Sequence, residues 1–142
     1  MYQKILLPTD GSKNANKEIE TALNIIDKEK GELILLSVAS NIITLQLSNE
    51  DDISNLNTLL SKNAEENVAN MKEKINANVK ISTKVVAGSP AKSIIEVAKE
   101  ENVDLIVIAS SGKSGLDKLF LGSVAENVVK NAKNDVLLIH KL

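Results

Sequence analysis

The chain has 142 residues and a formal net charge of −2, and apolar residues make up 43% of it, values typical of one globular domain with a single core. Aromatic residues contribute only 1%, which nearly excludes base stacking, and the small negative net charge predicts no strong electrostatic steering toward nucleic acid. The absence of cysteine excludes disulfides and thiolate chemistry and agrees with a cytoplasmic location, and no segment approaches the roughly 20 apolar residues of a membrane span.

Apolar runs and helical repeats alternate along the first half of the chain. A short buried strand is predicted at 5–7, followed by a dense cluster of turn residues. Ser12 is the predicted N-cap of a helix that continues to about residue 28, and a second buried strand is predicted at 33–38. Residues 39–51 match neither the helical nor the strand period, and we interpret them as a partly ordered loop or a lid.

The same alternation continues through the second half. Its predicted elements are helices at about 52–75, 90–101 and 122–132 and strands at 79–86, 104–109 and 136–139. The strand at 79–86 alternates apolar and polar residues, which is typical of the edge of a sheet. Strands that alternate with helices predict right-handed βαβ units and a parallel sheet. The sequence therefore indicates the α/β class, in one domain that covers residues 1–142.

Two loops rich in turn residues follow buried strands, at 8–12 and at 109–122. In open parallel sheets, ligands bind beyond the carboxyl ends of the strands, where the strand order reverses. Ser123 and Glu126 fit a capping box at the start of the last helix, and the free N–H groups of a helix start attract anions. The pattern predicts a phosphate cradle. Asp10 would accept a hydrogen bond there from a ribose hydroxyl or a base amine, or meet a phosphate-bound Mg²⁺.

Several better-known motifs are absent. A P-loop ending at Gly112-Lys113-Ser114 would need glycine where Val107 stands, and the first turn lacks a Rossmann glycine fingerprint. His140 is the only histidine, and nothing in the sequence places an acid or an oxyanion hole beside it. Lys113 is either a phosphate partner or an exposed loop lysine, and we favour the second interpretation. Because arginine is absent, a phosphate site must use backbone N–H groups, hydroxyls and lysine.

The segments just described resemble the universal stress protein family nearly from end to end. The resemblance is carried by KILLPTDGS at 4–12, the strand ending at Val38, Gly88-Ser89-Pro90, DLIVI at 104–108, the glycine loop and VLLI at 136–139. The nucleotide-binding branch of that family carries G-x2-G-x9-G-[ST], which Gly112, Gly122 and Ser123 match. Ala109 replaces the first glycine of this motif, and Ser111 stands where His or Arg is frequent.

The resemblance implies an open five-stranded parallel sheet of order 3-2-1-4-5 with helices on both faces, as in Rossmann-like and adenine nucleotide alpha hydrolase-like folds. It implies ATP between the first and fourth strands, with Mg²⁺ or Mn²⁺ held by the phosphates and no metal ligands from the protein. Asp10 would meet the adenosine end and the Val38 backbone the adenine, while Pro8 and Thr9 line the pocket. The residues implied around the ribose and phosphates are Ala109, Ser111, Gly112, Gly122, Ser123 and Val124.

The resemblance also implies a homodimer built through the last strand, by Val136, Leu137, Leu138 and Ile139. The function it implies is a regulatory, ATP-binding role in a stress response, through nucleotide-dependent dimer or partner interactions. Ala109 leaves a second function open, that of a nucleotide-free dimeric interaction module. A third is an enzyme, either a slow ATPase or a nucleotidyl-transferring relative. Phosphoryl transfer normally needs cationic clamps and a positioned base, so we expect slow ATP hydrolysis at most and assign no catalytic residue.

Overall fold

The computed structural model describes residues 1–40, 50–110 and 121–140. In chain order its elements are β1 (Lys4–Pro8), α1 (Ala15–Ile25), β2 (Glu32–Ser40), α2 (Glu50–Glu73), β3 (Lys80–Gly88), α3 (Pro90–Glu100), β4 (Leu105–Ala109), α4 (Ser123–Asn131) and β5 (Asp135–Ile139). Strands and helices alternate as the apolar patterns predict, which confirms the α/β class.

All the described strands run parallel in one sheet of order β3-β2-β1-β4-β5, which confirms the implied topology. The pairing of β2 with β3 extends over both strands, from Glu32 opposite Lys80 to Ser40 opposite Gly88. By contrast, β1 and β4 pair only at Ile5–Leu105 and Leu6–Ile106. The strand order reverses at β1, so the least paired neighbours of the sheet lie at the point where the connections change direction.

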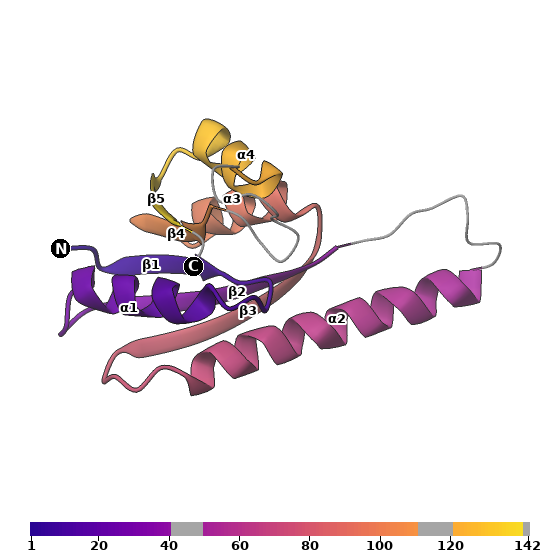
Figure 1. The fold of residues 1–142 in the computed structure, drawn as a ribbon, viewed down its shortest axis with the longest axis horizontal. Helices are drawn as coiled ribbons and strands as arrows, with labels where there is room; N and C mark the ends of the chain where they lie inside the picture. The colour runs from indigo at the N-terminus through magenta and orange to yellow at the C-terminus, as the bar shows by residue number, and fades with distance from the viewer. Residues whose placement is uncertain (41–49, 111–120, 141–142) are drawn as a thin grey trace.

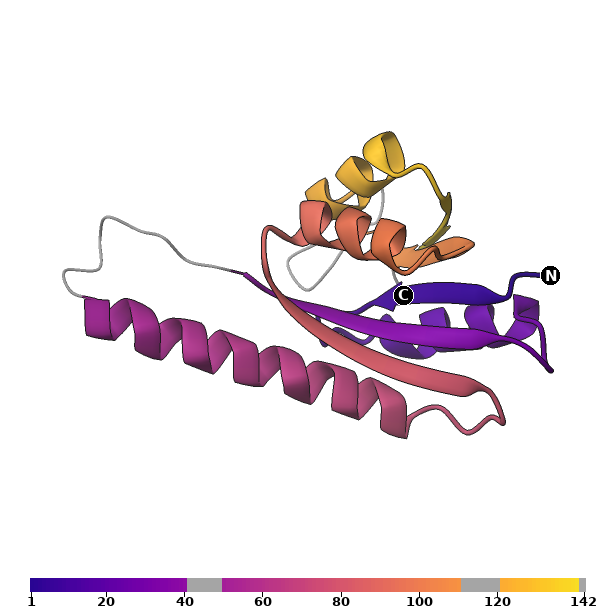
Figure 2. The ribbon, with the colours of Figure 1, turned by 180° about the vertical axis from the view of Figure 1, so that it is seen from behind.

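Two layers of helices enclose this sheet. Helices α1 and α2 cover one face, and α3 and α4 cover the other (Figure 1, Figure 2). Alternate residues of the central strands enter the two separate cores, because side chains point to opposite faces in turn. Leu7, Leu35 and Val107 belong to the core beneath α1 and α2, whereas Leu6, Ile34 and Ile106 belong to the core beneath α3 and α4.

Helix α2 extends well beyond the sheet at its amino end (Figure 1, Figure 2). Its buried residues Ala64, Val68 and Met71 lie in its second half, whereas Leu59 is 62% exposed. The lid or loop predicted at 39–51 falls mostly on residues 41–49, which lie outside the described residues. Strand β2 continues to Ser40, two residues beyond its predicted end, and α2 begins at Glu50, two residues before its predicted start, and ends at Glu73.

The two helix starts predicted from serine are both wrong. Helix α1 has Asn14 as its N-cap, because Ser12 belongs to a preceding turn in which its carbonyl accepts a bond from the Ala15 N–H. The N-cap of α4 is Gly122, without a side-chain capping bond. The predicted capping box does not form, and the Glu126 carboxylate instead pairs with Lys130 one turn along the helix, at 2.9 Å.

Removing a central core side chain should show how much the fold depends on this sheet. Leu35→Ala, at a fully buried position of β2, is expected to lower the free energy of unfolding by about 2–5 kcal/mol through lost burial and a cavity. Leu59→Ala, which makes the same chemical change on the exposed side of α2, should alter it by less than about 0.5 kcal/mol. Urea unfolding followed by circular dichroism measures both, and equal effects would contradict the burial assigned here.

Candidate functional site

The candidate site lies where β1 and β4 separate. Their pairing ends at Leu6 and Ile106, and beyond it each strand continues without the other. The N–H of Gly122 donates to the carbonyl of Ser110 at 2.7 Å, which holds the start of α4 at the end of β4. The predicted site segments of β1, β4 and α4 therefore meet at one edge of the sheet. Ser111 and Gly112, with the rest of 111–120, lie outside the described residues.

The turn after β1 presents Asp10 at this edge. The Asp10 Oδ1 accepts a bond from the Ser12 N–H at 2.9 Å, and the Gly11 N–H donates to the Thr9 Oγ1 at 3.1 Å. These local bonds define the turn, while the Asp10 side chain stays exposed. A carboxylate has about four acceptor positions, so Asp10 has the capacity to bind a ligand hydroxyl as well as its own turn.

Helix α2 supports this turn through Asn67. Gly11 has φ +81°, which disfavours any other residue, and a Cβ placed there would lie 2.4 Å from the Asn67 Oδ1. On the sheet side, the Asn67 Nδ2 donates to the Ser37 Oγ at 3.5 Å. Asn67 thus fills the space between the turn and β2, and the glycine allows it to lie there.

The backbone of Val38 faces the same space. The Thr9 N–H donates to the carbonyl of Leu36 at 2.7 Å, so the backbone groups of Leu36 are directed toward β1. Alternate residues of a strand direct these groups to the same side, which turns the Val38 N–H and carbonyl toward the position just beyond Pro8. Strand β1 ends at Pro8. This is the placement that a backbone contact to a planar base requires.

Ala109, which replaces the first motif glycine, is accommodated in an ordinary strand conformation. It ends β4 opposite Ile139, and its side chain is half-buried. Among the described residues, Asn102 is the one non-glycine with a positive φ, at 52°. Ala109 therefore has no positive φ that would strain an L residue, and the added methyl group is compatible with the backbone here.

Glu18 is the site residue that the sequence analysis did not identify. It lies in the first turn of α1, is only 3% exposed, and accepts a hydrogen bond from the Ala109 N–H. Burial, followed by the negative charge of Asp10, raises its pKa to about 9, against the opposing effect of the Ala109 bond. The carboxyl group is therefore neutral at pH 7. Its Oε2 is a buried atom for which the described part of the chain offers no hydrogen-bond partner.

A signal for Glu18 was present in the sequence. The buried positions of α1 are Ala15, Glu18, Ile19 and Ala22, which follow the i, i+3, i+4, i+7 spacing of one helix face. A carboxylate at such a position interrupts the apolar stripe. Buried acids are rare without a partner, so a carboxylate within this apolar stripe indicates a role other than packing.

The start of α4 has backbone donors that no side chain caps. Gly122 has φ −63° and ψ 152°, and no side chain caps the helix. The first N–H groups of an α-helix have no intrahelical acceptor, and the helix dipole gives them a partial positive charge. Ser123 is exposed and Val124 half-buried, so the N–H groups and the Ser123 hydroxyl are available where the resemblance places the phosphates.

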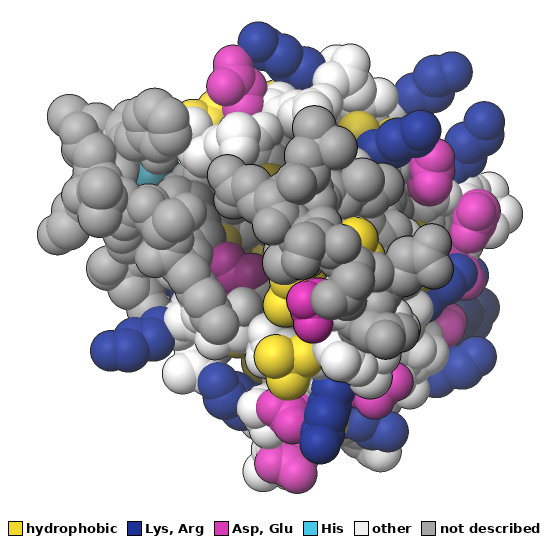
Figure 3. All heavy atoms as spheres, turned by 90° about the vertical axis from the view of Figure 1, so that its right-hand side faces the viewer, with side chains coloured by type: hydrophobic (Ala, Val, Ile, Leu, Met, Phe, Trp, Pro, Cys, Tyr) yellow, Lys and Arg dark blue, Asp and Glu magenta, His cyan; other side chains and the backbone are white. Residues whose placement is uncertain are grey.

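Charge on this side of the molecule is unevenly distributed. In its described parts, lysine side chains project mostly at the rim, whereas acidic side chains occur both at the rim and nearer the middle, where some apolar side chains also appear (Figure 3). The described residues contain no group of three or more His, Asp or Glu side chains able to hold a metal ion.

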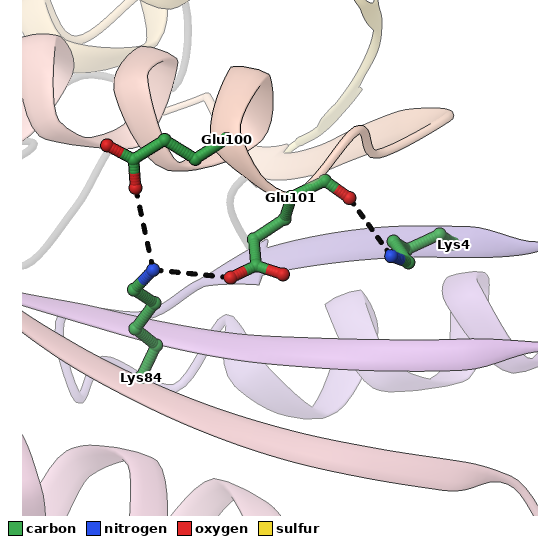
Figure 4. Close-up of polar contacts among 4 residues, drawn as sticks. All are labelled: Lys4, Lys84, Glu100 and Glu101. Carbon is green, nitrogen blue, oxygen red and sulfur yellow. Dashed lines mark hydrogen bonds and ion pairs between the residues drawn. The ribbon is translucent and has the colours of Figure 1, made fainter.

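Charged residues on the α3 side of the sheet form structural ties. The Lys84 Nζ lies 3.6 Å from a carboxylate oxygen of Glu100 and 3.2 Å from one of Glu101, and the Lys4 Nζ donates to the Glu101 carbonyl at 3.0 Å (Figure 4). These contacts join the end of α3 to β3 and β1. Because Glu100 is 65% exposed, its pair with Lys84 contributes little to stability.

A groove lies between the amino half of α2 and the end of β3. Its volume is about 820 Å³, and its lining is Ile53, Ser54, Asn57, Thr58, Ser61, Lys62, Glu65 and Ala87. It is an open groove beside the edge strand and contains none of the predicted site residues. Among the described helices, none is long and apolar enough to cross a membrane.

The sequence and the fold agree with one family. Residues 1–140 match the model of the universal stress protein family. The chain belongs to the universal stress protein family. It is 35% identical to the universal stress protein MJ0531 of Methanocaldococcus jannaschii over 142 residues, which cover 99% of this chain and 84% of that protein.

Two solved structures extend the comparison to three dimensions. The protein MJ0577 of Methanocaldococcus jannaschii is 31% identical and superposes with a TM-score of 0.87, over 100% of this chain and 98% of that chain. The universal stress protein UspA from Lactobacillus plantarum is 25% identical, with a TM-score of 0.81 over 98% of both chains. This universal stress protein therefore has the Rossmann-like α/β fold of its relatives along its whole length.

The burial of Glu18 predicts a specific dependence of stability on pH. Its pKa is higher in the folded chain than the unfolded value of about 4.3, so the folded state binds the extra proton. The contribution of this group to the free energy of unfolding is therefore greatest below pH 4.3. It falls as the pH rises toward 9, by at most about 1.4 kcal/mol per pH unit.

Glu18→Gln removes this titration and should flatten the decline between pH 5 and 9, making the variant the more stable form above neutrality. Urea unfolding at a series of pH values measures it. Glu20→Gln, at an exposed position of the same helix, is the matched control and should keep the wild-type profile. Parallel wild-type and Glu18→Gln profiles would show that Glu18 is ionised in the folded chain.

Proposed function

We propose that this universal stress protein binds ATP at the edge where β1 and β4 separate, and that it belongs to the nucleotide-binding branch of its family. The observation that carries the proposal is the meeting of the Asp10 turn, the end of β4 and the start of α4 at this switch in strand order. Open parallel sheets bind their ligands at such a point, and the start of α4 offers N–H groups to an anion.

In the proposed complex, the Asp10 carboxylate binds the adenosine end and the Val38 backbone contacts the adenine, with Pro8 and Thr9 lining the pocket. The Gly122, Ser123 and Val124 segment binds phosphate and ribose groups through N–H and hydroxyl donors. Ala109 lines the proposed pocket between the Asp10 turn and the start of α4. Ser111 and Gly112 complete the site by their place in the motif, and Mg²⁺ or Mn²⁺ is held by the phosphates.

Relatives of the same fold support an adenine nucleotide as the ligand. A universal stress protein of 24% identity has been solved in complex with cAMP, and one from Arabidopsis thaliana, of 20% identity, with AMP bound. At these identities the similarity to our chain shows a shared fold only. The choice of ATP rests on the glycine motif and on the donors of α4.

We assign the site to binding and regulation, with hydrolysis slow at most. His140 is exposed just beyond β5, and the chain has no arginine to stabilise charge on a transferred phosphoryl group. Nucleotide binding would then act through dimer or partner interactions in a cytoplasmic stress response.

One observation favours a second function, a nucleotide-free interaction module. The Ala109 N–H, at the end of β4, already donates to Glu18. A ligand that needs this donor must compete with an internal carboxyl group. A chain that has lost nucleotide binding would also tolerate Ala109 in place of glycine.

The ligand is expected to accompany the purified protein. Denaturing protein that has been prepared without added nucleotide should release an adenine nucleotide in near-stoichiometric amount, measured by chromatography. Gly122→Val is expected to reduce this amount because a branched side chain crowds the donors at the start of α4. Gly122→Ala, which adds a single methyl group, is the control and should retain more ligand. Far-ultraviolet dichroism should be the same for all three proteins.

If the wild type is empty, a thermal shift with ATP and Mg²⁺ decides between the two functions, since a ligand that binds only the native state stabilises it. A rise in the unfolding temperature supports the binding site. No rise would contradict it and leave the nucleotide-free module as the function.

We further propose that the protein is a homodimer through β5. This strand is the sheet's last, so its outer edge has no strand partner in the described chain. Of the implied contact residues, Leu137 and Leu138 are 36% and 38% exposed, whereas Val136 and Ile139 pack in the two cores. An apolar, unpaired edge strand is suited to pairing with a second copy.

Leu138→Asp should therefore convert the dimer into a monomer, because it places a charge in the proposed interface. Leu59→Asp, at the exposed leucine of α2, is the control and should leave the assembly unchanged. Sedimentation velocity distinguishes the two species. A wild-type monomer, or a dimer that survives Leu138→Asp, would contradict an interface at β5.

A further inference from the structure

Glu18 has a feature that packing alone leaves unexplained. Its carboxyl group is almost completely buried, yet the Oε2 has no hydrogen-bond partner in the described part of the chain. A polar atom in this condition destabilises the fold, because it has lost its bonds to water and gained none in return. Such an atom is expected to acquire a partner when the site is occupied.

The position of the carboxyl group identifies the space it faces. It binds the N–H of Ala109, on the last residue of β4, and it is close enough to Asp10 for that charge to affect its protonation. Ala109 and Asp10 follow the two strands that separate at the switch point. The Glu18 carboxyl therefore lies near the ends of β1 and β4, where these strands have separated.

We propose that Glu18 is a ligand-contacting residue, which together with Asp10 holds one ribose hydroxyl group and sets a preference for ribonucleotides over deoxyribonucleotides. The proposal rests on the proposed nucleotide site and deepens it by naming a residue that determines its specificity.

The protonation of the pair matches the chemistry of a hydroxyl group. Asp10 is an exposed carboxylate and accepts hydrogen bonds, whereas the buried Glu18 is a neutral acid with an O–H to donate. A hydroxyl group donates one bond and accepts others, so it bridges the two. An ammonium group, which only donates, would satisfy Asp10 and leave the Glu18 O–H without an acceptor.

Few charged groups face this carboxyl. Asp10 is the charged side chain of the described chain that shifts the Glu18 pKa by its charge, and Ala109 contributes its N–H. On the strands packed against α1, Lys4 lies at the opposite end of β1, and β4 has no ionisable side chain. The protonation of Glu18 is therefore controlled by burial and by Asp10. A ligand that keeps Glu18 buried keeps its carboxyl group protonated and able to donate a hydrogen bond.

The test compares ATP with 2′-deoxyATP and 3′-deoxyATP by calorimetric titration at pH 7. For wild type, one of the two deoxy analogues should bind at least about tenfold more weakly than ATP. That analogue lacks the bridging hydroxyl, so both carboxyl groups are left without it. Glu18→Leu should reduce this preference for ATP over the deoxy analogue by about threefold or more, because Asp10 alone then binds the hydroxyl. Glu18→Gln, whose amide N–H replaces the acid O–H, should keep the preference, as should the exposed control Glu20→Gln.

A pH series provides the second measurement, which does not depend on the leucine variant folding. Raising the pH to 10 should weaken the wild-type preference, since an ionised Glu18 no longer donates to the hydroxyl, while Glu18→Gln should keep it. Two outcomes would overturn the role of Glu18 without overturning the nucleotide site. In one, wild type binds all three nucleotides equally; in the other, Glu18→Leu keeps the wild-type preference. Wild type that binds none of them overturns the nucleotide site as well.

Discussion

The short pairing between β1 and β4 is the constraint on which the site depends. Strand β1 is bonded to β2 along its whole length, from Lys4 opposite Glu32 to Pro8 opposite Leu36, but to β4 at two positions only. A fully paired sheet would use the backbone groups of Ala109 in a ladder. Because the strands separate instead, these groups become available to a side chain or a ligand, and polar residues enter between two otherwise apolar strands.

Glu18 illustrates how stability and function oppose each other at this point. An apolar residue would continue the buried face of α1 formed by Ala15, Ile19 and Ala22, and would avoid the cost of a buried acid. The chain has instead a carboxyl group that remains neutral at pH 7 because burial and Asp10 both disfavour its charge. Local rules of folding are most often broken where a protein binds something, and the single interruption of this apolar stripe lies directly beside the predicted site.

The sequence predicted the architecture well because the apolar patterns are strong. Runs such as Leu33 to Leu36 are buried from end to end, and the alternating residues of β3 mark an edge strand. The helix starts were predicted poorly, since serine is a common N-cap, but the observed capping residues are Asn14 and Gly122. Spacing cannot show which of several neighbouring polar residues begins a helix, because the preceding turn decides it.

Within the candidate site, sequence reasoning singled out residues that a motif or a turn makes visible and did not single out residues defined by tertiary contact. Asp10 and Gly122 stand out in the chain because they flank strands and helix starts. Asn67 is one of several asparagines in a long polar helix, and only the fold shows it between the turn at Gly11 and the Ser37 hydroxyl. Its role could not be inferred from α2 alone.

Helix α2 contributes no residue to the glycine motif, but it affects the candidate site through Asn67. Gly11 is restricted by its positive φ and by the amide that lies against it, so the turn and the helix each limit where the other can lie. The same turn holds Asp10 through the bond to the Ser12 N–H. A displacement of α2 at this level would therefore displace the Asp10 carboxylate, whereas the exposed amino half of the helix, around Leu59, is free of this restriction. The part of α2 packed on the sheet acts as a structural support for the turn, and the position of Asp10 depends on contacts from two elements distant in sequence.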